Sequence, residues 1–163
     1  MTQKTRYTLT QFLIIFTIFS GTMAPLAHAS ACSLATAAGR WAFTVTGSII
    51  LPTGAAIPVV QVGTFREDRA GNLEGSQTRS VGGSVGKETL TGTASVHPDC
   101  SGTATPALYD ESGSLVRTTT PDFVLDEDGN HARSIITSIV LPNGASLAPL
   151  LTADYRRVFS LEK

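Results

Sequence analysis

The stretch WAFTVTGSII, residues 41–50, places its larger apolar side chains Trp41, Phe43 and Val45 at every second position, with small or polar residues between them. This alternation is what a half-buried β-strand requires, because successive side chains of a strand point to opposite faces. Seven further runs rich in Thr, Val and Ile follow, each preceded by a turn that contains Gly. No window sustains the 3.6-residue apolar period of an amphipathic helix. The sequence therefore predicts an all-β domain.

The connections between these runs are short, so consecutive strands are expected to pair antiparallel in an up-and-down order. Eight such strands close naturally into a β-barrel, which removes the exposed edges of a sheet. Pro121 is expected to interrupt the sixth strand, because proline has no N–H to donate to a neighbour. The strands are predicted at residues 41–50, 57–66, 73–81, 88–96, 103–109, 114–125, 132–141 and 147–159.

The first 29 residues have the features of a secretory signal peptide. Lys4 and Arg6 give a positive start, residues 12–19 form a short apolar run, and Ala27-His28-Ala29 matches a cleavage site. We expect cleavage after Ala29, which leaves residues 30–163 as one β-barrel domain that is secreted or periplasmic. No other stretch is long and apolar enough to predict a membrane span.

The charge of the predicted mature chain is mildly acidic. Without Lys4 and Arg6, 10 basic residues face 13 acidic ones, which gives a net charge of about −3. Affinity for nucleic acid comes mainly from Lys and Arg contacts to phosphate, and the chain has no basic stripe. Nucleic acid is therefore not an expected partner.

Both cysteines, Cys32 and Cys100, lie in the predicted mature chain, and an even count in an exported protein favours a disulfide. In the predicted topology both cysteines belong to the same end of the barrel. An alternative is that Ala29-Ser30-Ala31-Cys32, which loosely resembles a bacterial lipobox, carries a lipid on Cys32.

A repeat of eight residues supports this layout. SIILPTGA at residues 48–55 returns as SIVLPNGA at residues 138–145. Each copy bridges an odd strand to the next even one, so both turns should lie side by side at one rim. Their Leu and Pro residues either form an apolar recognition surface or fold inward and plug the barrel.

Three family resemblances accompany this prediction. Gly39-Arg40-Trp41 resembles the G-x-W motif of the calycin group, the lipocalins and avidin-like barrels, which implies a calycin-like barrel. In that group the Trp lies at the closed end beneath an Arg of the last strand, a role that Arg156 or Arg157 would take here. Residues 92–103 resemble the G-T-x-x-V-x-x-D-C-x-G-T hairpin of an uncharacterised secreted bacterial β-barrel family. The third resemblance, to allene-oxide-cyclase-type barrels, is one of architecture only.

Three motifs could carry chemistry. Residues 82–86 spell G-x-S-x-G, but a nucleophile elbow needs a following helix, so a Gly-rich turn is expected. Residues 126–130 resemble the start of a calcium loop, but Thr137 stands where an EF-hand needs Glu, so an Asp-Gly hairpin turn is expected. His97 and His131 are expected to be exposed turn residues, since a zinc site needs three or four ligands. We predict no catalytic residue, metal or cofactor.

Four arginines lie inside predicted strands, and we expect them to point outward because Arg is rarely buried. An inward Arg would need a carboxylate partner, and such a pair could orient a ligand carboxylate. The arginines are Arg66, Arg79, Arg117 and Arg133, and the available partners are Glu74, Glu88 and Asp154.

The expected function is binding of a small apolar ligand inside the barrel, because ligand pockets are mostly apolar. One alternative is a cyclase or isomerase acting on an apolar substrate, for which Glu88, Arg117, Asp154 and Tyr155 are the candidates. Another is a structural or interaction role at the cell surface. The sequence leaves enzyme activity and oligomeric state open. The predicted ligand-binding residues are Phe43, Val45, Leu51, Phe65, Leu141, Leu147 and Tyr155.

Overall fold

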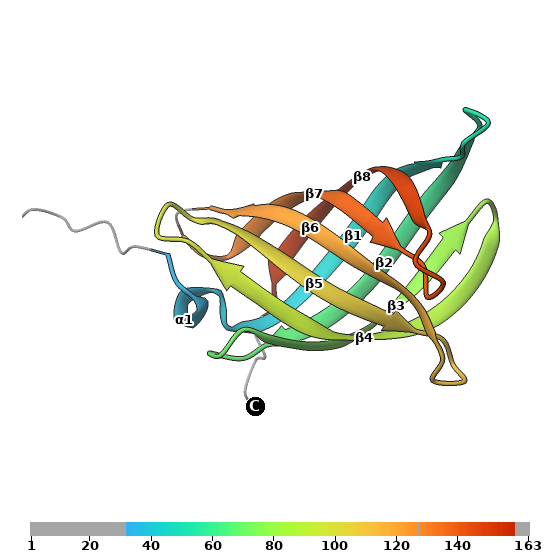
Figure 1. The fold of residues 1–163 in the computed structure, drawn as a ribbon. Helices are drawn as coiled ribbons and strands as arrows, with labels where there is room; N and C mark the ends of the chain where they lie inside the picture. Colours follow the sequence, from blue (N-terminus) through green and yellow to red (C-terminus); the bar gives the residue numbers. More distant parts are fainter. Residues whose placement is uncertain (1–31, 127, 159–163) are drawn as a thin grey trace, which may run out of the picture.

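The computed structural model describes residues 32–126 and 128–158, and the predicted signal peptide lies outside these ranges. Eight antiparallel strands follow one another around a closed barrel, as predicted (Figure 1). A four-residue helix, α1 (Leu34–Ala37), precedes them and was not predicted. The strands are β1 (Gly39–Ile50), β2 (Ala56–Glu67), β3 (Asn72–Val81), β4 (Ser84–Val96), β5 (Ser101–Tyr109), β6 (Leu115–Leu125), β7 (His131–Val140) and β8 (Ser146–Arg157).

Closure of the barrel depends on β1, which pairs with both β2 and β8. Trp41 lies opposite Phe65 on one side and Arg157 on the other. The four turns that join an odd strand to the next even one lie at one end, which we call the mouth. The other three turns and α1 lie at the opposite end, which we call the α1 end (Figure 1).

The start of β4 differs from the prediction. β4 begins at Ser84 instead of Glu88, because Gly82 and Gly83 alone make the turn from β3. Their φ angles are 57° and 89°, and positive φ at both central residues is typical of a type I′ hairpin turn. The G-x-S-x-G pattern is therefore a tight hairpin followed by a strand, and Ser84 is exposed.

Pro121 does not break β6, contrary to the prediction. The pairing with β7 shifts register there, so that Thr120 lies opposite Ser138 and Pro121 lies opposite Ile136. The intervening Thr137 uses its hydroxyl to donate a 2.9 Å hydrogen bond to the carbonyl of Thr120. A β-bulge thus lets the strand continue past a residue that cannot donate to the ladder.

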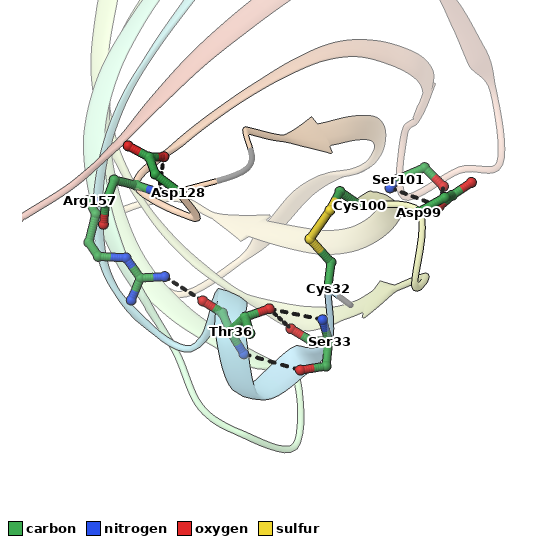
Figure 2. The surroundings of a disulfide bond; sticks show 9 residues. Cys32, Ser33, Thr36, Asp99, Cys100, Ser101, Asp128 and Arg157 are labelled. Carbon is green, nitrogen blue, oxygen red and sulfur yellow. Dashed lines mark hydrogen bonds between the residues drawn. A yellow bond between two sulfur atoms is a disulfide. The ribbon is translucent and has the colours of Figure 1, made fainter. Parts of the chain in front are cut away.

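The α1 end is closed by the chain segment that precedes β1. Cys32 and Cys100 form the predicted disulfide, which ties this segment to the β4–β5 turn (Figure 2). Ser33 and Thr36 form reciprocal hydrogen bonds that cap α1. A cysteine in a disulfide cannot carry a lipid, so this bond excludes the alternative of a lipidated Cys32. The disulfide is compatible with an extracytoplasmic protein. Within the described ranges, no helix reaches the length and apolar character needed to cross a membrane.

Arg157 covers the indole ring of Trp41, with its Cζ atom 4.8 Å from the ring centroid. Its guanidinium donates to the backbone carbonyls of Thr36 (2.6 Å), Ala38 (2.7 Å) and Gly129 (2.9 Å and 3.1 Å). Trp41 Nε1 donates to the carbonyl of Ala37 at 2.9 Å. Arg157 of β8 and Trp41 of β1 thereby both bond to the segment that contains α1, which closes this end of the barrel. Figure 2 shows the bond from Arg157 to Thr36.

The disulfide is expected to stabilise the fold chiefly by constraining the unfolded chain. Its cysteines are 68 residues apart, and a loop of that size corresponds to about 4 kcal/mol in the chain-entropy model. Replacing both cysteines by Ser should lower the free energy of unfolding by about that amount, measured by urea denaturation. Equal unfolding midpoints for the two proteins would contradict the assignment.

The contact between Arg157 and the ring of Trp41 should also stabilise the fold. Arg157→Ala is expected to lower the free energy of unfolding by about 2–4 kcal/mol, since it removes a cation–π contact and several charged hydrogen bonds. Trp41 is the only tryptophan in the chain, so its fluorescence reports unfolding at this point. The matched control is Arg156→Ala, whose side chain is exposed and which should change stability by less than about 0.5 kcal/mol. Equal effects of the two substitutions would argue against the contact.

Candidate functional site

The interior of the barrel holds a cavity of about 360 Å³. This volume lies within the range of about 300–1,000 Å³ that is usual for small-molecule sites. Residues from both ends line the cavity, from Trp41 and Glu67 at the α1 end to Leu141 and Leu147 at the mouth. The barrel is therefore hollow along much of its length, although side chains alone can fill the interior of an eight-stranded barrel.

Three aromatic side chains form one wall of the cavity. Phe43, Phe65 and Tyr155 pack against one another with ring centroids 5.9–6.0 Å apart, and Trp41 stacks on Phe65 at 6.5 Å. The Tyr155 hydroxyl lies 3.2 Å from that of Ser134. Burial raises the pKa of Tyr155, and the hydrogen bond with Ser134 opposes this. The tyrosine is therefore neutral and serves as an apolar wall with one polar atom.

A buried carboxylate, Glu88, lies near the mouth with only 3% of its surface exposed. Arg117 donates two hydrogen bonds of 2.7 Å to Glu88, one to each carboxylate oxygen. Arg79 donates through Nε to Oε1, and Gln77 donates to Oε2 at 2.7 Å. We call these four residues the Glu88 cluster. A charged pair of this kind tolerates burial because every carboxylate oxygen has donors.

The hydrogen bonds decide the ionisation of Glu88. Burial on its own raises the pKa of the carboxyl, but the hydrogen bonds and charge of Arg117, with the bonds from Gln77 and Arg79, outweigh it. The pKa of Glu88 is therefore held below its usual range, and the group is an anion at neutral pH.

The Glu88 cluster contains two guanidinium cations and one carboxylate, so it carries a net charge of about +1. Arg79, Arg117 and Gln77 line the cavity. Among the described residues, the terminal nitrogens Nη1 and Nη2 of Arg79 have no protein acceptor. The Arg79 and Arg117 side chains are 25% and 12% exposed, so the cavity reaches solvent beside them. The cluster thus presents a surplus of cationic donors at the mouth.

The orientation of two arginines corrects the sequence analysis. Arg66 and Arg133 point outward as expected, whereas Arg79 and Arg117 point into the barrel. Burial of these two is possible because Glu88 shares the same face and supplies the counter-charge.

Six of the seven residues predicted to bind a ligand line the cavity. They are Phe43, Val45, Phe65, Leu141, Leu147 and Tyr155. Leu51 is half-buried in the β1–β2 turn and is not part of the lining.

The apolar residues at the mouth divide between the cavity and the surface. Leu141 of the second repeated turn lines the cavity, as do Leu147 and Leu151 of β8, while Pro52 and Pro142 of the two turns are exposed.

Sequence reasoning missed Glu67, the last residue of β2, because the predicted strand ended at Arg66. The side chain is 6% exposed, lines the cavity at the α1 end, and has an Oε1 atom without a hydrogen-bond partner among the described residues. Burial raises its pKa to about 7, although the Arg157 charge lowers it and Asp68 raises it. Continuing the inward alternation of Val59, Gln61 and Phe65 by one step would have found it.

The outer surface carries a second polar cluster, which corrects the interpretation of His131 as an exposed turn residue. His131 contacts Asp126 through Nδ1 at 2.7 Å and Asp154 through Nε2 at 2.6 Å. Hydrogen bonds from Asp154 and Asp126 raise the pKa of the imidazole. Because Asp154 is engaged outside the barrel, it does not face the cavity.

The calcium-like segment includes residue 127, which lies outside the described ranges. Within those ranges, no group of three or more His, Cys, Asp or Glu side chains is arranged to hold a metal ion.

The Glu88 cluster generates a stability prediction. Glu88→Gln leaves two guanidiniums close together without their counter-ion, so the free energy of unfolding should fall by about 3–5 kcal/mol. The lowered pKa means that the stabilisation is complete above the ordinary pKa of 4.5 and is lost as the pH falls through the folded value.

Urea denaturation at several pH values tests this. The difference between wild type and Glu88→Gln should be constant above pH 4.5 and shrink as the pH falls below it. Glu74→Gln, on the outer face of β3, is the control and should change stability little at any pH. A difference that does not change with pH would contradict the ionised state of Glu88.

No protein-family model matches this chain, and comparisons with curated proteins and with solved structures found no significant match. The closed up-and-down order of the eight strands is consistent with a calycin-like architecture.

Proposed function

We propose that this protein binds an amphipathic molecule whose apolar body occupies the barrel and whose anionic head lies on Arg79 and Arg117. The observation that carries this proposal is the interior cavity of about 360 Å³, with apolar walls and two cationic side chains at its mouth. Pockets of this composition are typical of small-molecule binding, where a few polar groups fix the orientation of an apolar ligand.

The walls favour an extended apolar body. Aromatic residues lie toward the α1 end, and aliphatic residues such as Ile136, Ile139 and Leu151 continue toward the mouth. Each buried methylene group of a ligand would contribute about 0.8 kcal/mol. The affinity would therefore grow with the length of the chain that the cavity accepts.

The charge at the mouth favours an acidic head. Arg79 lies two residues before the end of β3, and Arg117 lies two residues after the start of β6. Both strand ends belong to the mouth, so a head group there would stay near solvent while the tail extends toward Trp41. A ligand carboxylate would accept hydrogen bonds from the guanidinium donors that Glu88 leaves unused.

A cyclase or isomerase activity has less support from the candidates that the sequence offered. Asp154 contacts His131 on the outside, Glu88 is an anion held by two arginines, and the pKa of Tyr155 is raised by burial. A general base needs a pKa near the working pH and access to the substrate. None of these three residues meets that requirement.

Titration with a fluorescent polyene fatty acid tests the proposal. Wild type should take up one molecule per chain. Arg79→Gln should weaken binding by about tenfold or more, since a hydrogen bond to a charged group contributes about 1.5–3 kcal/mol. Arg117 still pairs with Glu88 in this variant, so the fold should persist.

Two controls make the titration specific. Arg66→Gln, on the outer face of β2, should bind as wild type does. The corresponding polyene alcohol, which lacks the charge, should bind wild type and Arg79→Gln equally. Ala104→Phe, which fills the cavity, should reduce uptake of both probes. Absence of uptake by a folded wild-type barrel would end the proposal, and concentration-dependent mass in light scattering would then favour a surface interaction role.

A further inference from the structure

We infer that Glu67 forms a second polar subsite at the α1 end of the cavity, which recognises a hydroxyl or carbonyl oxygen at the far end of the ligand. This inference rests on the proposed function, because it concerns the same cavity. It narrows the ligand class to aliphatic carboxylic acids that carry an oxygen function at or near the end of the chain.

The position of Glu67 places its carboxyl deep in the molecule. The residue pairs with Gly39 of β1 and with Leu73 of β3, at the α1 end of the barrel. Only 6% of its surface is exposed, and it lines the cavity together with Ala37 and Trp41.

The nearest cation does not satisfy this carboxyl. Arg157 acts on Glu67 through its charge, but its guanidinium nitrogens donate to the carbonyls of Thr36, Ala38 and Gly129. Oε1 of Glu67 has no hydrogen-bond partner among the described residues. A buried polar atom without a partner destabilises the protein by its desolvation penalty, and a ligand that supplies the partner gains affinity by removing that penalty.

The protonation state sets which partners fit. The pKa of about 7, raised by burial and by Asp68 against the charge of Arg157, makes Glu67 a neutral acid below neutral pH. The residues of α1, Leu34–Ala37, add no charged group. A neutral carboxyl both donates and accepts, so it complements a hydroxyl or a carbonyl, whereas the ionised form only accepts.

The separation of the two subsites sets the length of the ligand. Leu73, opposite Glu67, and Arg79 are six residues apart on β3. At a strand rise of about 3.3 Å per residue, and with the usual strand tilt, they lie roughly 15 Å apart along the barrel axis. An extended fatty acid of the length of laurate bridges this distance with its carboxylate at the mouth and its other end at Glu67.

Competition against the fluorescent polyene acid tests the inference with laurate and ω-hydroxylaurate, which differ only by the terminal oxygen. At pH 6, wild type should bind ω-hydroxylaurate about tenfold more tightly than laurate, the ratio expected for one satisfied buried group. Glu67→Leu should remove this preference, while Glu67→Gln, whose amide donates and accepts, should keep it. Glu74→Gln is the outer-face control and should behave as wild type does.

The two proposals fail in different ways. Equal affinity of wild type for both acids, with each displacing the probe, would overturn the Glu67 subsite and leave the proposed binding function intact. If neither acid nor the probe binds a folded barrel, both are overturned. A second readout is a terminal methyl-ketone analogue of laurate, whose advantage over laurate should disappear above about pH 8 because an ionised carboxyl cannot donate to a carbonyl. An advantage that persists at that pH would contradict the subsite.

Discussion

Closure of the sheet through the pairing of β1 with β8 is the constraint on which the rest of the structure depends. Because side chains alternate along a strand except at a β-bulge, the inward position of Trp41, Phe43 and Val45 determines which residues of the paired strands face inward. A slip of one residue in β3 or β4 would move Arg79 or Glu88 to the solvent. The cavity and both of its charged regions are therefore consequences of one closed hydrogen-bonding register.

The sequence predicted the barrel, its topology, the disulfide and six lining residues, because strong alternation in β1 and Gly-containing turns are local signals. It failed where the decisive partner is distant. In β3, Ser and Thr occupy the outer face, so polarity did not distinguish it from an inner face that contains Gln77 and Arg79. The inward Arg117 is understandable only beside Glu88, 29 residues away. The helix α1 is too short for a periodic signal and forms through its own cap and the disulfide.

Glu67 and Glu88 show how the pKa values of two buried carboxyls on one inner face shift in opposite directions. Burial raises the pKa of both groups. At Glu88, Arg117 and its neighbours direct their N–H groups at the carboxylate and stabilise the anion. At Glu67 the nearby Arg157 has already committed its N–H groups to backbone carbonyls, so it acts through charge alone, and desolvation prevails.

The same argument explains why an ionic cluster at the mouth is compatible with an apolar ligand. Without Glu88, two adjacent guanidiniums would repel each other and remain strongly hydrated, and a ligand would have to displace that water. With Glu88, the guanidiniums are held in place and most of their charge is balanced before any ligand arrives. What remains is close to one positive charge, which matches a single carboxylate better than a doubly charged phosphate. Glu88 therefore weakens the field at the mouth while preorganising the donors, and this combination favours a monoanionic head on a long apolar body.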